Sequence, residues 1–429
     1  MLHLKNIDKD KFDDFVKTHK TKSHFLQSSA WGEFSKDNKG VTPYYLGLVD
    51  DKDKILATAL LLQKKLPLNY SYFYCPRGFV IDYNNKELIK EMTQELKKFA
   101  KNKKGVYVKI DPDIKLHNLD LDGNVLEGED NYKLIDYLKT LGYKHLGFNK
   151  AFEHSQPRYT FRLELKPTIE EVINNFHNTT KKVINRGNIY DLEIEKNKDD
   201  AIEGFYQTML ETAKRENLSL HPIKYFDDFY KLLHKRNMSD IYIIYLNKKK
   251  TIKAITNKIK ELNKYKDTLQ IENKIKEIDN QITKQEKLLK EVKKVKEDKY
   301  PLSSIITAKF NDKVWTVHGG NSTILRELNS NYLIYFEIIK DALKEGYKTV
   351  DFFGTTYNPT TNDPEYGIWL FKKRLGGEYT EFIGELDLVT NKLMYFALTK
   401  LLKVYRNIKK KKRRKEIQNG TSNSNWKRV

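Results

Sequence analysis

The segment from Lys248 to Lys299 constrains the fold of this chain more strongly than any other stretch. No proline occurs between Pro222 and Pro301, and the segment holds 17 lysines and 9 acidic residues. Its apolar residues recur three and four positions apart in two series, which is the spacing of a coiled-coil seam. The first series is Ile252, Ile255, Ile259, Leu262 and Leu269, and the second is Ile275, Ile278, Ile282, Leu289 and Val292. We therefore expect long helices here.

The phase of this pattern slips between Gln270 and Asn273. The slip predicts a reversal between two helices of about 20 and 25 residues, so we interpret residues 247–299 as an antiparallel helical hairpin roughly 30 Å long. One continuous helix that dimerises is the alternative. The flanking segments Ile241–Leu246 and Ser303–Phe310 are strand-like, so the hairpin would be an arm inserted between adjacent strands. Its basic outer faces fit a tRNA-like or phosphate-rich partner, unless they are only a solvated surface.

Strands and helices alternate outside the arm. Aromatic and β-branched runs such as Gly105–Asp113 and Tyr159–Leu165 predict strands. Asn85–Lys103 reads as an amphipathic helix, and Thr168 with Glu171 has the spacing of a capping box. The order helix, strand, strand, helix, strand occurs twice, so we predict an α/β (α+β) fold of two similar modules. The expected boundaries are residues 1–150 for the first module, 151–246 with 300–399 for the second, 247–299 for the arm and 400–429 for a basic tail.

The charge of the chain narrows the choice of partners. Lysine plus arginine total 79 against 58 acidic residues, a formal net charge of +21 over 429 residues. This surplus favours nucleic acid, an anionic membrane face or a phosphorylated substrate, unless it only reflects a lysine-rich proteome. The single cysteine, Cys75, excludes an intramolecular disulfide framework, and the histidines lack the spacing of metal ligands. Neither a secretory signal nor an apolar run of ~20 residues is present, so we expect a soluble cytosolic protein.

No familiar catalytic signature is present. The sequence lacks GxxxxGK[ST], GxGxxG, GxSxG and HExxH, and also the pyrophosphate loop with which acetyltransferases hold acetyl-CoA. Four other segments have a residue content that is unusual for an ordinary core strand or surface loop. They are FLQSSAWGEFSK (Phe25–Lys36), YFYCPRGFVIDY (Tyr72–Tyr83), NLSLHPIKYFDDFY (Asn217–Tyr230) and VDFFGTTYNPTTNDPEYGIWLFKKRLGGEYTEFIGELD (Val350–Asp387).

Together these segments resemble the FemABX family, the tRNA-dependent aminoacyltransferases that build the cross-bridge peptides of peptidoglycan. The resemblance runs from Phe25 to about Leu398. It is carried by LQSxxWGxxxK, PRGxVxDY, DFFGT and YGxxxFKxxxGGxxxExIGExD, in this order and spacing. It implies two tandem GNAT-like modules without acetyl-CoA, with an antiparallel coiled-coil arm in the second. Members with such an arm belong to the branch that transfers glycine, alanine or serine.

The reaction that the resemblance implies is attack by a primary amine on the ester carbon of an aminoacyl-tRNA. The amine would belong to the stem peptide of a muropeptide precursor, either lipid-linked or nucleotide-linked. The ester is already activated, so the protein would need to supply only alignment, proton removal and stabilisation of the oxyanion. No cofactor and no metal are expected, and homologous Fem-type proteins are expected partners. The alternatives are a non-catalytic tRNA- or precursor-binding adaptor and a GNAT-type acetyltransferase.

The resemblance also implies roles in acceptor binding. Lys36 corresponds to the lysine that lies at the acceptor's phosphates or sugar, and Arg77 lies in the matching PRG element. Tyr225 fits a tyrosine of the family, but His221 stands where family members commonly carry an arginine that contacts the pyrophosphate. Because neutral histidine binds anions more weakly than a bidentate arginine, this departure puts the pyrophosphate contact in doubt.

The catalytic residues that the resemblance implies are Lys372, Asp111 and Glu385. Lys372 matches a lysine that contacts tRNA-linked or transition-state charge, and a protonated lysine could hold the oxyanion. Lys373 and Arg374 are its neighbours and could share this task. Asp111 and Glu385 are the carboxylates best placed to receive the amine proton, with helix capping and structural ion pairing as the competing explanations.

Two aromatic residues are further candidates for substrate binding. Trp31 and Tyr366 are candidates for stacking on substrate, although core packing is the alternative, above all for Trp31.

Residues 400–415 include ten basic residues and no acid. This tail could lie on anionic phospholipid, where each basic residue is worth about 1 kcal/mol; gripping tRNA or simple disorder are the rival explanations. We expect a cytoplasmic protein peripheral to the inner face of the plasma membrane.

Overall fold

The computed structural model describes residues 2–19, 22–150 and 155–400, so the basic tail lies outside the described residues apart from Lys400. The chain divides into two compact units. Unit 1 takes the described residues of Met1–Arg162, Phe353–Trp369 and Glu378–Val429. Unit 2 takes Leu163–Phe352 and Leu370–Gly377, so the chain crosses four times between the units and ends in unit 1.

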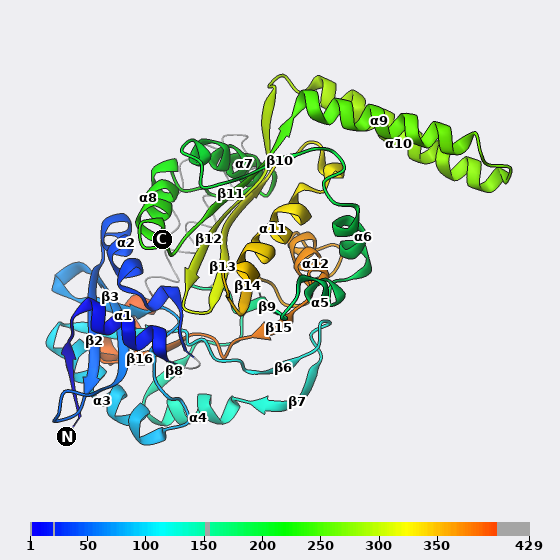
Figure 1. Cartoon of the computed structure of the whole chain (residues 1–429). Coiled ribbons are helices and arrows are strands. Elements are labelled where there is room, and N and C mark those ends of the chain that lie inside the picture. The colour runs from blue at the N-terminus through cyan, green and yellow to red at the C-terminus, as the bar shows by residue number, and fades with distance from the viewer. Residues whose placement is uncertain (1, 20–21, 151–154, 401–429) are drawn as a thin grey trace. The chain divides into compact units, whose positions relative to one another are not determined.

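Unit 1 is built on a seven-stranded sheet with the order β1-β2-β3-β4-β5-β16-β8 (Figure 1). Neighbouring strands run antiparallel except β4 and β5, which are parallel. The strands are β1 (His3–Asn6), β2 (Thr42–Val49), β3 (Ile55–Lys65), β4 (Ser71–Cys75), β5 (Gly105–Ile110), β8 (Tyr143–His145) and β16 (Leu386–Val389). A separate pair is formed by β6 (His117–Leu119) and β7 (Val125–Asp130).

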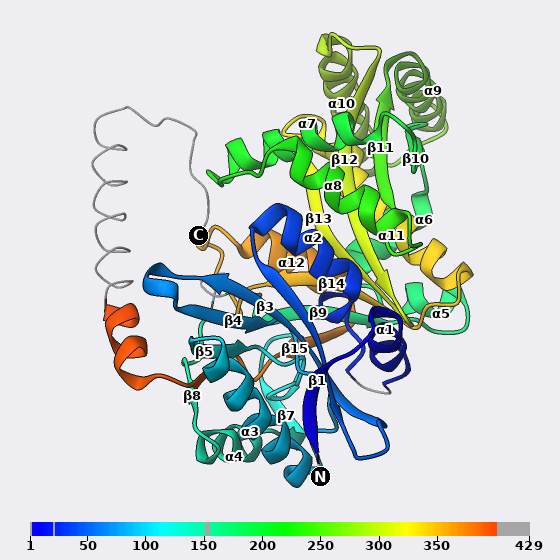
Figure 2. The same ribbon diagram turned by 90° about the vertical axis from the view of Figure 1, so that its left-hand side faces the viewer.

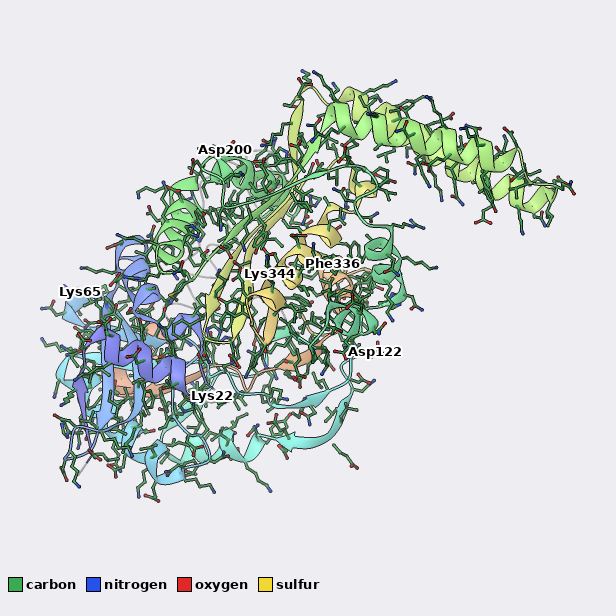
Figure 3. All side chains as sticks on the ribbon, in the orientation of Figure 1. Lys22, Lys65, Asp122, Asp200, Phe336 and Lys344 are labelled. Atoms are coloured by element: carbon green, nitrogen blue, oxygen red, sulfur yellow. The ribbon has the colours of Figure 1, made fainter. Side chains whose placement is uncertain are left out.

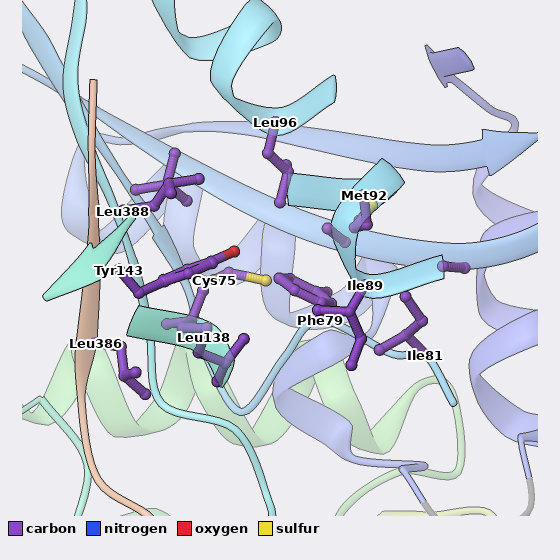
Figure 4. Close-up of a cluster of buried hydrophobic side chains, with 14 of the residues drawn as sticks. Cys75, Phe79, Ile81, Ile89, Met92, Leu96, Leu138, Tyr143, Leu386 and Leu388 are labelled. Carbon is purple, nitrogen blue, oxygen red and sulfur yellow. The ribbon is translucent and has the colours of Figure 1, made fainter. Parts of the chain in front are cut away.

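Helices pack against this sheet. Consecutive residues of β2 and β3 are buried, so side chains on both faces of these strands are covered. The helices are α1 (Lys9–Thr18), α2 (Ser29–Lys39), α3 (Lys86–Asn102) and α4 (Tyr132–Thr140), with short 3₁₀ turns η1 (Phe25–Gln27) and η2 (Pro67–Asn69). One core is made by side chains of the strands with Ile89, Met92 and Leu96 of α3, and it holds the buried Cys75 and Leu386 (Figure 4). Burial of this apolar surface is the main force that holds the sheet and α3 together.

Unit 2 is built around the second sheet, whose order is β10-β11-β12-β13-β14-β9-β15. The strands are β9 (Tyr159–Glu164), β10 (Glu193–Lys196), β11 (Ile241–Asn247), β12 (Lys299–Phe310), β13 (Lys313–Asn321), β14 (Thr349–Thr355) and β15 (Glu378–Glu381), of which β15, most of β9 and the end of β14 belong to unit 1. The helices are α5 (Ile169–Asn174), α6 (Asn178–Arg186), α7 (Ala201–Arg215), α8 (Ile223–His234), α9 (Lys248–Lys266), α10 (Glu272–Lys294), α11 (Ser330–Lys344) and α12 (Tyr366–Arg374), with η3 (Arg326–Leu328). The first part of α12, up to Trp369, is assigned to unit 1. The capping box predicted at Thr168 and Glu171 is confirmed at the start of α5.

The two sheets repeat one topology. In the first, β1 to β5 lie in chain order, and the only parallel step among them, β4 to β5, is bridged by α3. In the second, β10 to β14 also lie in chain order, and the parallel step from β13 to β14 is bridged by α11. The predicted mixed α/β class is therefore confirmed. Three segments that were expected in the second module, residues 155–162, 353–369 and 378–399, lie in unit 1. The last of them contains β16, which lies between β5 and β8 of the first sheet.

The arm occupies the connection between β11 and β12, which corresponds to the tight turn between β2 and β3 in the first sheet. Helices α9 and α10 pack against each other and project as a hairpin from this end of the strands (Figure 1). Leu262, Ile278 and Ile282 form the buried centre of the seam. The alternative of one continuous helix is wrong, because α9 ends at Lys266 and α10 begins at Glu272.

The second seam differs from the expectation at one position. Leu288 is buried and Leu289 is only half-buried, whereas the sequence pattern placed Leu289 in the seam. Neighbouring residues of an α-helix point about 100° apart, so at this level α10 buries a face next to the seam rather than the seam position itself. Among the described residues, no helix is long and apolar enough to cross a lipid bilayer.

Candidate active site

The strongest candidate site lies in unit 1, where β4 and β5 end. These two strands are parallel, with Cys75 of β4 beside Ile110 of β5, so their carboxyl ends meet at one edge of the sheet. Arg77 follows β4 after one proline, and Asp111 follows β5 directly. The strand-to-loop transition thus brings together two residues that the sequence analysis selected separately. Such edges are a common location of ligand sites in α/β proteins.

Asp111 is buried and accepts a hydrogen bond on each carboxylate oxygen. The Tyr74 phenol donates to Oδ2 at 2.8 Å, and the backbone N–H of Arg77 donates to Oδ1 at 2.7 Å. Arg77 has a φ of 52°, in the left-handed region that residues other than glycine rarely adopt. This strained backbone conformation accompanies the hydrogen bond from its N–H to Asp111. Strain of this kind is concentrated at functional sites.

The environment of Asp111 makes it a proton acceptor at neutral pH. Burial raises the pKa of the Asp111 carboxyl to about 7, because the charged form loses its hydration. The positive charge of Arg77 opposes this shift, and the negative charge of Glu385 adds to it. A carboxyl group that titrates near neutral pH has the pKa that suits a general base working there.

Glu385 is buried beside this group but is engaged in a different way. Lys109 Nζ lies 2.9 Å from its Oε2, and the backbone N–H of Ser155 donates to its Oε1 at 2.6 Å. Lys109 also pairs with Asp387 at 3.0 Å. The ion pairing that competed with a role as base is therefore present for Glu385. We call Asp111, Tyr74, Arg77, Lys109 and Glu385 the Asp111 group.

The Arg77 side chain is bound to the protein itself. Its Nη2 donates to the carbonyl oxygen of Pro157 at 2.7 Å, and its guanidinium lies 4.2 Å from the ring centre of Phe382. The side chain is buried, so it holds backbone and ring in place. Contact of Arg77 with a bound anion stays a prediction.

The LQS and PRG motifs are joined through Gln27. Its Nε2 donates to the carbonyl oxygen of Pro76 at 2.6 Å, and its Oε1 accepts from the N–H of Leu60 in β3 at 2.9 Å. A Cβ on Gly78 would stand 2.7 Å from the Gln27 side chain, so the glycine allows this close approach. The two motifs thus build the loop that carries Arg77.

In unit 2, the candidate residue is Lys372, which lies on α12. Its side chain is almost completely buried, and burial lowers the pKa of its ammonium to about 7. The negative charge of Asp351, in the buried part of β14, opposes the shift. Lys372 therefore differs from the ordinary protonated lysine that its sequence suggested, because burial makes its ammonium easier to deprotonate. Lys373 and Arg374 are half-buried at the end of the same helix.

The end of α12 is fixed to a second helix of unit 2. The carbonyl oxygen of Arg374 accepts from the N–H of His177 at 3.0 Å and from the hydroxyl of Thr180 in α6 at 2.8 Å. Phe371 packs edge-on against Tyr332 and Tyr335 of α11, with ring centres 4.9 and 5.0 Å apart. These contacts hold the helix turn that carries Lys372.

His221 and Tyr225 are brought together at the start of α8 in unit 2. Their rings stack with centres 4.0 Å apart, and the ring of His318 meets Tyr225 edge-on at 6.1 Å. Burial raises the pKa of the Tyr225 phenol to about 12, so this group remains a hydrogen-bond donor at neutral pH. His221 itself is exposed. The pair is an aromatic platform with two polar edges, and its contact with a pyrophosphate stays a prediction.

The remaining candidates belong to unit 1. Trp31 is buried in α2 and packs against Phe25 and Phe34, with ring centres 6.0 and 5.4 Å away, which is the core role that the sequence analysis held as the alternative. Lys36 is exposed on the same helix. Tyr366 is half-buried and lies 5.9 Å from the ring of Trp369. None of these three residues has a described contact with Asp111.

Sequence reasoning missed Tyr74 and Lys109. A signal for Lys109 was present, since in β5 the residues Val106, Val108 and Ile110 are buried on one face and Lys109 shares the other face with Tyr107. Tyr74 carried no such signal, because its hydrogen bond joins residues 37 positions apart. Among the described residues, no cluster of histidine, cysteine, aspartate and glutamate has the geometry of a metal site.

Comparisons with known proteins agree on one family. The sequence model of the FemAB family matches residues 7–403. A lipid II:glycine glycyltransferase of Staphylococcus epidermidis is 29% identical over 411 residues, which cover 92% of this chain and 95% of that protein. A lipid II:glycine glycyltransferase of Staphylococcus aureus is 28% identical over 439 residues, covering 96% and 99%. The crystal structure of FemX superposes with a TM-score of 0.72 at 26% identity and covers 92% of this chain and 99% of that one.

Proposed function

Because the chain belongs to the FemAB family, we propose that it is an aminoacyltransferase that moves an amino acid from aminoacyl-tRNA to the stem-peptide amine of a peptidoglycan precursor. The acceptor is lipid II, the substrate for which the curated relatives are named. Glycine is the first donor to test, because the same names specify it. The product is an interpeptide bridge extended by one residue, together with free tRNA.

The observation that carries the proposal is the environment of Asp111. The acceptor enters as an ammonium ion and must lose a proton before its nitrogen can attack the ester carbon. The buried Asp111 carboxylate, whose pKa is raised to about 7 by burial, takes this proton. The hydrogen bonds from Tyr74 and from the Arg77 backbone hold the carboxylate in one orientation. Glu385 has a supporting role, because Lys109 already pairs with its charge.

Lys372 stabilises the negative charge that develops on the ester oxygen. A buried cation is effective there because it needs little reorganisation in a site from which water is excluded. The charge of Asp351 favours the protonated form that this role requires. The attacking amine and the activated ester are both substrate groups, so no covalent intermediate forms on the protein. What the protein contributes is alignment, proton transfer and electrostatic stabilisation.

The donor and the acceptor are both polyanions, which suits a chain with a net charge of +21. The arm, with lysines along its solvent-facing surfaces, contributes to binding of the tRNA body. Lys36 is a candidate for contact with the acceptor's sugar or phosphates, His221 and Tyr225 for contact with a pyrophosphate, and Tyr366 for stacking on substrate. Trp31 and Arg77 support unit 1 by packing, since their side chains are buried against other residues of that unit. The enzyme works at the inner face of the plasma membrane, alongside related Fem-type transferases.

The test is direct. The purified chain is incubated with lipid II and with tRNA charged with one amino acid at a time, and the precursor is analysed by mass spectrometry. We expect a gain of one residue mass with glycyl-tRNA and none with uncharged tRNA. Nucleotide-linked precursor is tested in parallel, since transfer to that acceptor alone would reject lipid II as the substrate. Absence of transfer from every charged tRNA would reject the proposal.

A further inference from the structure

Three of the strongly exposed apolar side chains of unit 1 lie on two neighbouring segments. Leu68 is 82% exposed, Leu393 85% and Phe396 59%. Leu68 lies at the tip of the β3–β4 connection, within η2, and the other two lie on the helical segment 392–400 that follows β16. Single exposed apolar residues are ordinary, but a group of them on one surface indicates an interaction site.

The two segments lie side by side at the beginning of β5. After the β3–β4 tip, Ser71 donates its N–H to the carbonyl oxygen of Lys104 at 3.1 Å. Before the helical segment, Thr390 donates its hydroxyl to the carbonyl oxygen of Gly105 at 2.6 Å, and Asn391 donates its N–H to Val106 at 3.1 Å. The tip of β3–β4 and the segment drawn in orange-red after β16 accordingly appear on the same side of unit 1 (Figure 2).

Leu68 is exposed on a turn whose backbone conformation is unfavourable for leucine. Leu68 has a φ of 59° and Asn69 a φ of 62°, both in the left-handed region. Asparagine tolerates this region, whereas a leucine there is strained by its side chain. The turn is closed by the N–H of Leu66, which donates to Tyr70 at 2.8 Å. An exposed leucine in a strained turn adds nothing to the core, so its presence is better explained by a contact outside the chain.

Basic residues predominate in the segments that carry or adjoin these three side chains. Segments 64–71, 100–105 and 390–400 together contain seven lysines and no acidic residue. Lys65 is exposed beside the tip (Figure 3), Lys104 is exposed just before β5, and Lys400 Nζ lies 4.3 Å from the ring centre of Phe396. Residues 401–415, which continue the chain from this point, add nine more basic residues and again no acid.

We propose that this docking face, made of Leu68, Leu393, Phe396 and the seven surrounding lysines, binds the surface of an anionic phospholipid bilayer. The apolar side chains enter the boundary between headgroups and acyl chains, and the lysines pair with lipid phosphates. Neither signal alone gives stable anchoring, and the combination of apolar insertion with a polybasic segment does. An RNA partner is less suited to this face, because exposed leucines make no stacking or phosphate contacts.

The inference depends on the proposed function only for its purpose, which is to place the enzyme where a lipid-linked acceptor lies. It is tested with the full chain and without any substrate. Co-sedimentation is measured with vesicles of phosphatidylcholine and phosphatidylglycerol and with vesicles of phosphatidylcholine alone. The test variant carries Leu68→Ser, Leu393→Ser and Phe396→Ser. The matched control carries Leu210→Ser, Leu218→Ser and Ile271→Ser, three exposed apolar positions of unit 2.

We expect the wild type and the control to bind the anionic vesicles, more weakly as salt is raised, and the test variant to bind at least about tenfold more weakly. The test variant should still transfer an amino acid to a water-soluble acceptor with a short lipid chain, which separates this inference from the proposed function. The inference would be overturned if the wild-type protein did not co-sediment with anionic vesicles. It would also be overturned by a test variant that binds vesicles as wild type does, or by one that loses tRNA binding and keeps vesicle binding.

Discussion

Unit 1 contains two buried carboxylates whose surroundings are arranged in opposite ways. Glu381 of β15 forms an ion pair with Arg158, accepts a hydrogen bond from Tyr159 at 2.8 Å and lies 2.8 Å from a ring nitrogen of His117. Asp111 accepts hydrogen bonds from a phenol and a backbone N–H, and its pKa is raised to about 7 by burial. One carboxylate is paired with a cation, whereas the other is protonated more readily than an ordinary carboxylate.

The difference shows how burial serves two purposes in one unit. A buried ion pair with full hydrogen bonding fixes strands in register, and removing one partner leaves an uncompensated charge. A buried carboxylate with only partial compensation weakens the fold whenever it is ionised, because its pKa in the folded state lies above the unfolded value of ~3.9. The buried Asp111 carboxyl therefore lowers the free energy of unfolding at pH values above ~4. Perturbed groups of this kind are concentrated at functional sites.

The largest effect is expected from Asp111→Asn. The amide cannot accept the amine proton, so kcat for transfer should fall by ~10²–10⁴-fold, the range typical of a lost general base. The folded state should be at least as stable as wild type at pH 8, because the cost of ionising a buried carboxyl is removed. Transfer to lipid II and urea denaturation measure the two quantities.

Glu385→Gln is the matched control for this change. It also neutralises a buried carboxylate of the Asp111 group, but it leaves Lys109 with only Asp387 as a partner. We expect a smaller loss of rate than for Asp111→Asn and a clear loss of stability. The reverse order of rates would make Glu385 the base and contradict the comparison.

Arg158→Leu should produce the largest change in stability. It leaves Glu381 buried without its guanidinium, which is expected to lower the free energy of unfolding by about 3–5 kcal/mol. Urea denaturation measures the change. The double variant with Glu381→Leu should regain much of this loss, since no unpaired charge remains. A single variant as stable as wild type would show that the ion pair is not the main support of this region.

Lys372→Arg tests the proposed role of the Lys372 ammonium in stabilising the oxyanion. A bell-shaped dependence of kcat/KM on pH is expected near pH 7, rising as Asp111 loses its proton and falling as Lys372 loses its own, since burial lowers the pKa of Lys372 to about 7. Arginine stays protonated, so the variant should lose the alkaline decline and keep the acid limb. Initial rates between pH 5 and pH 9 decide this, and an unchanged alkaline limb would exclude Lys372 as its source.

Tyr74→Phe is expected to have the smallest effect. The hydrogen bond from Tyr74 favours the ionised form of Asp111, so its loss should raise the pKa of Asp111 further. The acid limb of the rate profile should then move to higher pH by about one unit or less, equivalent to roughly 1 kcal/mol. A shift to lower pH would mean that the phenol does not support the carboxylate.

The fold could be predicted where local patterns determine it. The heptad spacing and its slip near Gln270 specify two antiparallel helices, and strand patterns with turn residues specify the repeated α/β order. The position of β16 could not be predicted in this way. Leu386–Val389 pairs with β5 and β8, and no local feature of four residues indicates which of two sheets they join.

The candidate site was accessible from the sequence only in part. Asp111 and Arg77 follow recognisable strands, so their meeting follows from parallel pairing of β4 and β5. The burial of Lys372 was hidden, because FKKR places three basic residues in a row and such a run normally faces water. The electrostatic interaction of Lys372 with Asp351 depends on the packing of α12, which is held by aromatic contacts of Phe371 with α11.

The most direct test of the account is a titration of the Asp111 carboxyl itself. Infrared difference spectra between the wild type and Asp111→Asn, recorded from pH 4 to pH 9, isolate its carboxylic acid and carboxylate bands. We predict a transition near pH 7, since burial raises the pKa of this group to about 7. A transition close to pH 4 would show an ordinary carboxylate, and Asp111 would then have no special capacity to take the proton from the attacking amine.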